Sequence, residues 1–569
     1  MLTAPPPFKP ALRFDEIAAS PPDFERTRAL YDELTARLDA AGTVPEAVEV
    51  FTAWDAQRRE FYSWSALTDL RFQQDTANPE YKAAIDLLNE LRPKITGLEV
   101  ALKKKFLASP LRAGLQRELG DYLFARWETE VTSYDPVVEP FAVKEAHVQD
   151  EYTELLSRAE YDFRGEHLNL SQIGKFGEHP DRELRREAAT VKWEFFSRNR
   201  EQLDSLYNTL VQIRTQTARE LEYHNFIELG YRRLTRTDYG PAEVARYREQ
   251  IVEEIVPLAT RITQRQARDL GLSELAVWDE HIFDRNSVPR PPQEYDRMVS
   301  VARDVFGALG PEIGGFAGLM IDRDLLDLRS RDRKASGGFC TSFPTYGLPY
   351  IFANFNGTTH DVNVLVHEMG HAFQNYSSRD IPISDYLWPT YEACEVHSMS
   401  MEFLTWPQLE RFFGDDAQRY RLRHLKSSIL FLPYGAAVDH FQHFVYENPD
   451  ATPADRHAFW KQLEATYLPW RRNGGIEHLE HGGYWQAQRH IYQMPFYYID
   501  YTLALCCALQ FWARSLDDYA GALADYRALC ARGGKLPFQA LVRSAGLRSP
   551  FDAGVLHDVA QRAESLMEL

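Results

Sequence analysis

The chain has 569 residues, of which 44% are hydrophobic and 13% aromatic, enough to build large buried cores and unlike a disordered chain. It contains 64 basic and 83 acidic residues, a formal charge of −19 at pH 7, which argues against nucleic acid as the main partner because phosphate binding needs clustered Lys and Arg. The five cysteines are scattered and form no CxxC pair, which favours a reducing, cytoplasmic location over a disulfide framework.

The N-terminal part of the chain has helical periodicity. The opening MLTAPPPFKP lacks the basic start and apolar run of a signal peptide. Apolar residues from Leu88 to Leu102 recur in steps of three and four, which predicts an amphipathic helix, and Pro93 within it predicts a kink or an interruption. The same periodicity is found in four other segments: residues 23–41, 46–67, 182–219 and 242–270.

A break in the helical pattern divides the chain unequally. Residues 174–181 read GKFGEHPD, a stretch rich in residues that disfavour helix. We therefore expect an N-terminal helical lobe at residues 1–175 and a larger domain at residues 176–569.

Strand-like segments are few. Residues 163–170 contain a short alternating piece, and residues 339–342 and 350–355 flank a turn rich in proline and glycine, which predicts a β-hairpin. The most apolar stretch, residues 495–512, carries Asp500 and reads as a buried helix, because a membrane span needs roughly 18 uninterrupted apolar residues. The sequence thus predicts a mainly α-helical fold with a small sheet and no membrane segment.

A metal-binding helix is predicted directly after the hairpin, where residues 358–376 read TTHDVNVLVHEMGHAFQNY. Thr358, followed three residues later by Asp361, resembles a capping box and indicates the start of the helix. Gly370 suits a position where this helix passes close to other backbone.

The HExxH motif lies within this helix. His367 and His371 are four residues apart, so they project from one face at a distance that suits one metal ion. Glu368 lies one step round the helix, where its carboxylate can reach a water molecule rather than the metal. Taken alone, the motif also fits a helix whose two histidines only pack.

A third ligand must come from elsewhere, because a catalytic zinc takes three protein ligands and leaves one position open. The elongated motif HExxHxxGxxH is excluded, since Gln374 and Ser377 occupy the places of its Gly and His. Residues 390–403 read TYEACEVHSMSMEF and are predicted to be helical. Spacing does not choose among the three carboxylates of this segment: Glu392, Glu395 and Glu402.

Together these segments resemble the oligoendopeptidase F and thimet oligopeptidase family of zinc peptidases, and in layout the bacterial oligoendopeptidase F branch in particular. The match is strongest over residues 334–501 and weak over the N-terminal 170 residues. The pieces that carry it are KASGGFC (334–340), NFNG (354–357), HEMGH (367–371), EVHSM (395–399) and His490 followed by PFYYIDY (495–501).

The resemblance implies a set of metal ligands and a general base. By it, His367, His371 and Glu395 bind one Zn²⁺ per chain, and Glu368 is the general base. His397 lies within the EVHSM segment, where the family varies, and is expected to support the site rather than to bind the metal.

The resemblance also implies that His490 and at least one tyrosine bind the tetrahedral intermediate. Pro495 suits the first turn of a helix that begins near residue 496. Of the tyrosines in this segment, we favour Tyr498 and Tyr501 over Tyr497. Aromatic residues at helical spacing are, on residue type alone, more often core.

The fold implied by the resemblance is a zincin-type (gluzincin) catalytic core within residues 176–569, in a two-lobed helical body around a deep substrate channel. The hairpin at residues 339–355 would provide an edge strand for an extended peptide. The expected function is a zinc-dependent endopeptidase acting on internal bonds of short oligopeptides. The alternatives are a zinc carboxypeptidase of similar fold and, more distantly, a helical binding protein without activity. The sequence predicts no oligomeric state.

Overall fold

The computed structural model describes residues 12–286, 288–292, 294–331, 333–335 and 337–568. The decapeptide MLTAPPPFKP and Ser336 of the KASGGFC segment lie outside the described residues. Helices dominate the described part, and its strands form two small sheets. The expected mainly α-helical fold with a small sheet is confirmed.

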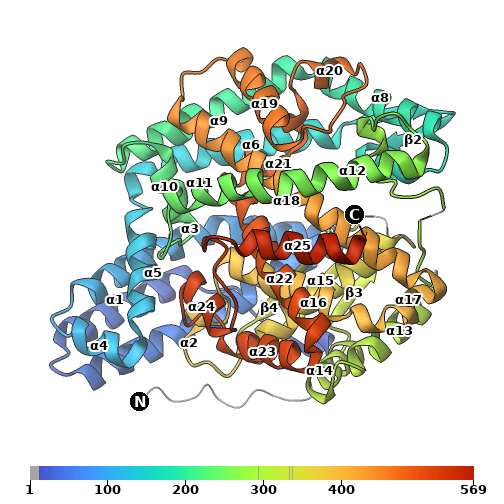
Figure 1. The fold of residues 1–569 in the computed structure, drawn as a ribbon. Helices are drawn as coiled ribbons and strands as arrows, with labels where there is room; N and C mark the ends of the chain where they lie inside the picture. The colour runs from blue at the N-terminus through green and yellow to red at the C-terminus, as the bar shows by residue number, and fades with distance from the viewer. Residues whose placement is uncertain (1–11, 287, 293, 332, 336, 569) are drawn as a thin grey trace.

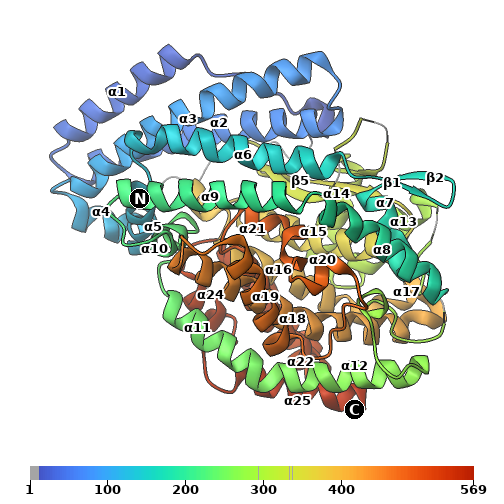
Figure 2. The same cartoon turned by 90° about the horizontal axis from the view of Figure 1, so that it is seen from above.

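Helices α1 to α5 gather on one side of the molecule, at the blue end of the chain in Figures 1 and 2. Trp54, Phe106 and Trp127 pack between them, with ring centroids 5.6 to 5.8 Å apart. These helices are α1 (Phe24–Ala40), α2 (Val44–Gln74), α3 (Pro79–Ala108), α4 (Arg112–Leu119) and α5 (Asp121–Thr132).

Helix α3 continues through Pro93 without a break. Leu88 and Leu91 before the proline and Ile95 after it are buried. Packing on both sides of the proline thus offsets the loss of the backbone hydrogen bond that proline cannot donate. Of the two alternatives predicted at Pro93, the interrupted helix is wrong.

The middle of the chain is helical as predicted, with more breaks than the periodicity indicated. The segment 182–219 forms two helices separated at Asn199, whose side-chain amide donates to the carbonyl of Phe195 and ends the first of them. The segment 242–270 contains a π turn, Ile251–Ile255. The elements of this part are α6 (Glu139–Ser157), β1 (Glu160–Phe163), β2 (Glu166–Asn169), α7 (Leu170–Gly174), α8 (Arg182–Arg198), α9 (Arg200–Glu220), α10 (Phe226–Arg233), α11 (Pro241–Gln250), α12 (Val256–Leu270), α13 (Tyr295–Gly307) and α14 (Pro311–Asp322).

A three-stranded sheet lies beside the helix of the HExxH motif. Its strands are β3 (Leu326–Arg329), β4 (Phe339–Phe343) and β5 (Leu348–Phe355), in the order β3-β5-β4. Strands β4 and β5 form the predicted antiparallel hairpin, with Phe339 opposite Phe352, and β3 is parallel to β5. Strand β4 is therefore an edge strand.

The remaining helices surround one large core, and α15, α16 and α22 lie close together within it (Figure 1). The apolar stretch at residues 495–512 forms most of α22 and is buried, as predicted. No helix in the described part of the chain combines the length and apolar character of a membrane span. The helices are α15 (Thr359–Ser378), α16 (Tyr391–Leu404), α17 (Glu410–Phe413), α18 (Ala417–Glu447), α19 (Pro453–Tyr467), α20 (Glu477–Glu480), α21 (Arg489–Gln493), α22 (Tyr498–Asp517), α23 (Tyr519–Arg532), α24 (Phe538–Ser544) and α25 (Val555–Met567).

The segment between α15 and α16 belongs to the core of the N-terminal helices. Ile381, Ile383, Tyr386 and Leu387 pack with residues of α1 to α5 in a second cluster. The Tyr386 hydroxyl donates to the Leu119 carbonyl and accepts from the backbone N–H of residue 123. The link between the two helices is thus held by the N-terminal helices.

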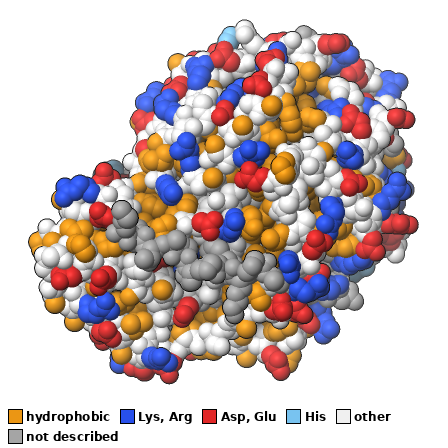
Figure 3. All heavy atoms as spheres, turned by 90° about the horizontal axis from the view of Figure 1, so that it is seen from below, with side chains coloured by type: hydrophobic (Ala, Val, Ile, Leu, Met, Phe, Trp, Pro, Cys, Tyr) orange, Lys and Arg blue, Asp and Glu red, His pale blue; other side chains and the backbone are white. Residues whose placement is uncertain are grey.

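The surface is mixed in charge. On the face shown in Figure 3, Lys and Arg side chains are interspersed with Asp and Glu. All five cysteines are unpaired, and three of them, Cys506, Cys507 and Cys530, are buried.

Candidate active site

Helix α15 begins at Thr359, as predicted, but its N-terminus is held differently from a capping box. The Thr358 side chain makes no capping hydrogen bond. Instead the Asp361 carboxylate accepts from the backbone N–H groups of Asn356 and Gly357, at 3.0 and 2.6 Å. The predicted capping box is therefore wrong, because the preceding loop folds back over the first turn and presents its own donors to Asp361.

Helices α15 and α16 touch backbone to backbone at Gly370. A Cβ atom there would lie 2.7 Å from the carbonyl oxygen of His397 and 2.7 Å from the Cα of Ser398, both on α16. Real Cβ atoms do not approach so closely, so only glycine allows this contact. The expectation of a close backbone approach at Gly370 is confirmed.

This contact brings Glu395 of α16 to the two histidines of α15. The Glu395 Oε2 atom lies 3.2 Å from His367 Nε2 and 3.6 Å from His371 Nε2. One ligand atom from each of the three residues lies within 4.8 Å of the other two. Two imidazole nitrogens and one carboxylate oxygen are a donor set that fits a catalytic zinc with one position left open. The Ser398 hydroxyl also donates a hydrogen bond of 3.0 Å to Glu395 Oε2.

The other two carboxylates of α16 have different surroundings. Glu392 is buried and accepts a hydrogen bond from the Tyr239 hydroxyl at 3.2 Å. Glu402 lies behind His367: its Oε1 is 2.8 Å from His367 Nδ1, and its Oε2 is 2.9 Å from His424 Nε2. A carboxylate on Nδ1 fixes the tautomer that presents Nε2 to a metal.

The Glu402–His424 pair has an electrostatic consequence. Burial alone would raise the pKa of Glu402, but the hydrogen bonds from His367 and His424 lower the pKa to about 2. In the sequence, Glu402 is a candidate ligand only, and no pattern indicates His424. The seven-residue spacing from Glu395 was the one available signal, because it places both glutamates on the same face of α16.

Glu368, the predicted base, lies on α15 next to this group and is 8% exposed. Burial raises its pKa, against the lowering effect of the two adjacent histidines. A carboxylate with a raised pKa is better suited to accept a proton and return it. His397, expected to be supportive, is buried, with its Nδ1 2.6 Å from the Ala393 carbonyl oxygen.

The aromatic segment approaches the metal group from α22. Phe496 has φ +66°, in the left-handed region that non-glycine residues seldom adopt. Its N–H donates to Gln442 Oε1 at 2.9 Å, and its carbonyl accepts from Arg236 at 2.6 Å. Helix α22 consequently begins at Tyr498, two residues later than expected.

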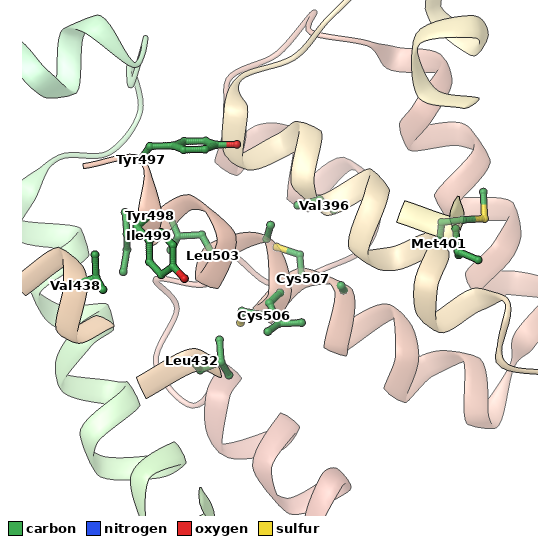
Figure 4. Close-up of a cluster of buried hydrophobic side chains, with 14 of the residues drawn as sticks. Val396, Met401, Leu432, Val438, Tyr497, Tyr498, Ile499, Leu503, Cys506 and Cys507 are labelled. Carbon is green, nitrogen blue, oxygen red and sulfur yellow. The ribbon is translucent and has the colours of Figure 1, made fainter. Parts of the chain in front are cut away.

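The structure separates the three tyrosines of this segment. The Tyr497 hydroxyl donates to Glu395 Oε1 at 2.9 Å, and the Tyr501 hydroxyl lies 3.4 Å from His490 Nε2. The Tyr498 ring projects to another side (Figure 4) and packs against Phe431 and Tyr434. Tyr497, which was not favoured from the sequence, is thus the tyrosine in contact with Glu395.

His490 is oriented by Gln488. The Gln488 amide lies 2.8 Å from His490 Nδ1, and its oxygen accepts from the Tyr434 hydroxyl at 2.9 Å. Burial lowers the pKa of His490. A neutral imidazole that accepts at Nδ1 carries its hydrogen on Nε2, the atom that faces Tyr501.

Comparison with known proteins bears on this geometry. The model of the Peptidase M3 N-terminal domain matches residues 14–134, and the model of Peptidase family M3 matches residues 176–307 and 313–560. The chain belongs to peptidase family M3. The resemblance drawn from the sequence is confirmed.

Individual M3 relatives agree with this membership. The chain is similar to the chromosomal oligoendopeptidase F of Lactococcus lactis subsp. cremoris, with 22% identity over 425 residues, 68% of this chain and 66% of that protein. It is similar to the structure of PZ peptidase A with inhibitor 2, with 41% identity, a TM-score of 0.93 and coverage of 98% and 99% of the two chains. A candidate oligoendopeptidase F from Bacillus anthracis str. Ames matches with 39% identity and a TM-score of 0.88, over 98% of each chain.

Proposed function

We propose that this M3 peptidase is a zinc-dependent endopeptidase that hydrolyses internal bonds of short oligopeptides. The observation that carries the proposal is the convergence of His367, His371 and Glu395 on one point, with Glu368 beside them. Two imidazoles and one carboxylate would hold one Zn²⁺ per chain and leave a position open. The similarity to oligoendopeptidase F and PZ peptidase A supports the endopeptidase assignment.

The protein side chains divide the chemistry among them. A zinc ion, when bound, supplies Lewis acidity, which polarises a carbonyl group and acidifies water. Glu368 would take the proton from the attacking water and transfer it to the leaving amine. Glu402 and His424 would keep the His367 ring in the tautomer that leaves Nε2 free for the metal.

We infer that His490 and Tyr501 donate hydrogen bonds to the oxyanion. His490 Nε2 and the Tyr501 hydroxyl lie 3.4 Å apart, and Gln488 orients the imidazole. The hydroxyl of Tyr497 would hold Glu395 in the orientation that a ligand needs. Tyr498 is also a candidate oxyanion donor from the sequence. Its packing against Phe431 and Tyr434 argues for a structural role instead.

The test uses internally quenched peptides of roughly 6–20 residues that are blocked at both ends. Such peptides are expected to bind in extended form along an edge strand and to be cleaved internally. We expect one zinc per chain and cleavage that a chelator abolishes and zinc restores. Cleavage only of peptides with a free C-terminus would instead support a zinc carboxypeptidase. Stoichiometric zinc without any hydrolysis would support the binding protein.

We make two further proposals, the first from the family resemblance and the second from the cysteines. By the resemblance, an N-terminal lobe (1–175) and a catalytic domain (176–569) would enclose a deep channel that admits extended peptides and excludes folded proteins. Native globular proteins should therefore survive incubation with the enzyme. The unpaired cysteines support a cytoplasmic location, which cell fractionation would test.

A further inference from the structure

A cavity of about 620 Å³ opens beside the metal group. Cys340 of β4 and Cys394 of α16, the residue before Glu395, line one side of it. Its other walls come from α2, α3, α5, the end of α10 and the segment between α15 and α16. The cavity therefore lies between the residue next to Glu395 and the N-terminal helices.

Four cationic side chains line the cavity, and two of them are neutralised by neighbouring carboxylates. The Arg58 guanidinium bonds to Asp55 at 2.7 Å and to Asp385 at 2.6 Å. The Lys103 ammonium bonds to Glu130 at 2.5 Å. These two cations hold the walls together and offer little to a ligand.

The other two, Arg126 and Arg233, are held less closely by carboxylates. Arg126 donates to the backbone carbonyl of Asp385, its Nε atom is buried without a partner, and it forms no ion pair within the described ranges. The Arg233 guanidinium forms a long ion pair, 3.5 Å, with Glu145 Oε2, and it shares this carboxylate with Arg214, which lies 2.6 Å from Oε1. A half-buried guanidinium whose donors are only partly taken up by neighbouring groups favours binding of an anion.

The edge strand leads into this cavity. Cys340, Thr341 and Ser342 of β4 line it, and among the described strands β4 pairs with β5 alone. An extended peptide added to the free edge of β4 would run from the scissile bond along the cavity wall. Because residues of a strand advance about 3.3 Å each, a group a few residues from the scissile bond would come to lie in the cavity.

We propose that this cavity binds a carboxylate of the peptide substrate, either an acidic side chain or the C-terminal carboxylate, a few residues from the cleaved bond. Arg126 and Arg233 are the residues that recognise it. The inference rests on the proposed peptidase function and adds a substrate preference to it.

The experiment uses the zinc-loaded full-length protein and a neutral quenched peptide with both ends blocked. One series places Asp or its isostere Asn at each position in turn, and a second compares the free C-terminal acid with the amide. We expect one position, or the free C-terminus, to raise kcat/KM by roughly 10- to 100-fold over its neutral partner, the size expected for hydrogen bonds to a charged group. The series that responds identifies the source of the carboxylate.

The variants Arg126→Gln and Arg233→Gln should each reduce the ratio of kcat/KM for the charged peptide to kcat/KM for its neutral partner towards one. For the neutral peptide, kcat/KM should stay within about twofold of the wild-type value. Arg126→Lys should retain part of the preference because it keeps the charge. Arg28→Gln, the same change at an exposed arginine paired with Glu25 on α1, is the matched control and should change nothing.

Dissociation constants of the same peptide pairs for Glu368→Gln provide a second readout that needs no turnover. The neutral peptide could be cleaved while the kcat/KM ratios, Asp over Asn and free acid over amide, stay near one at all positions. This result would overturn the carboxylate site and leave the peptidase function standing. Persistence of the preference in both arginine variants would also overturn it. Absence of cleavage in all peptides would refute the peptidase function instead, and the binding ratios would still decide on the cavity.

Discussion

At the scale of single residues, Glu395 and Glu368 belong to the same proposed site but have different proposed roles, metal ligand and general base. Glu395→Gln should lose most of the zinc, because a neutral amide is a poor replacement for a ligand carboxylate. Glu368→Gln should keep one zinc per chain and lose turnover by roughly 100- to 10,000-fold, since only proton transfer is removed. Metal analysis of the purified variants, together with kcat on a blocked peptide, separates the two roles. Full zinc in Glu395→Gln combined with loss of zinc in Glu392→Gln would show that the ligand is misassigned.

The tyrosines at the start of α22 should respond differently to loss of the hydroxyl. Tyr501→Phe should lower kcat by roughly 10- to 1,000-fold with little change in KM or melting temperature, because an oxyanion donor acts mainly in the transition state. Tyr497→Phe should weaken zinc binding by about 10- to 100-fold, since it releases Glu395. Tyr498→Phe is the internal control and should keep near wild-type turnover. A large loss of kcat in Tyr498→Phe alone would return the oxyanion role to that residue.

At the scale of elements, the contact between α15 and α16 determines whether a metal site forms. Gly370→Ala would place a methyl group 2.7 Å from the backbone of α16, so the two helices must separate. We expect a loss of roughly 1–3 kcal/mol of stability, as for other overpacked cores, and a weaker affinity for zinc. Denaturant unfolding with excess chelator measures the first effect, and competition with a zinc chelator measures the second.

Gly97→Ala in α3 is the matched control for this substitution. A Cβ atom at Gly97 meets nothing within 4 Å, so alanine there should leave zinc affinity unchanged and stabilise the helix by about 0.5–1 kcal/mol. Equal behaviour of the two variants would contradict the close-contact explanation.

At the scale of the whole molecule, a buried acidic pair makes stability depend on pH. Burial and the charge of Asp500 raise the pKa of Glu392 to about 8, and Asp238 adds to this shift. Burial, together with the charges of Asp439 and Glu395, raises the pKa of Asp500 to about 7, and Arg236 opposes both shifts. Both carboxyls bind a proton more tightly in the folded state than in the unfolded state, where the pKa is about 4. Their stabilising contribution is therefore complete below about pH 4 and is lost as pH rises to 7–8.

The prediction is that Glu392→Gln flattens the decline of unfolding free energy between pH 6 and 8, by up to about 1.4 kcal/mol per pH unit. Urea unfolding of wild type and variant at several pH values, with zinc removed by chelation, measures the two slopes. Parallel slopes would mean that Glu392 does not titrate in this range.

The sequence predicted those features whose causes are local. The HExxH helix, the hairpin at β4 and β5, and the glycine at the helix contact follow from periodicity, turn residues and spacing. The choice of Glu395 over Glu392 and Glu402 needed the family resemblance, because it depends on how α15 packs on α16 and no local pattern encodes that. His424 could not be predicted, since it reaches Glu402 from a separate helix.

The different roles of the three tyrosines could not be predicted from local spacing either. Helical spacing treats Tyr497, Tyr498 and Tyr501 as members of one regular helix. In the fold, Phe496 adopts a left-handed conformation held by Arg236, a residue 260 positions away in the sequence. This conformation delays the start of α22 and directs the Tyr497 hydroxyl to Glu395.

The segment between α15 and α16 has a consequence for how the enzyme would handle its metal. It joins the two helices that bear the proposed ligands, and Asp385 and Tyr386 fasten it to α2 and to the last residue of α4. Any displacement of the N-terminal helices must break these bonds or pull the segment along, and so alter the distance between Glu395 and the histidines. A peptide that displaces the N-terminal helices on binding would therefore change the affinity of the site for zinc. By thermodynamic reciprocity, the bound metal would change the affinity for the peptide by the same factor.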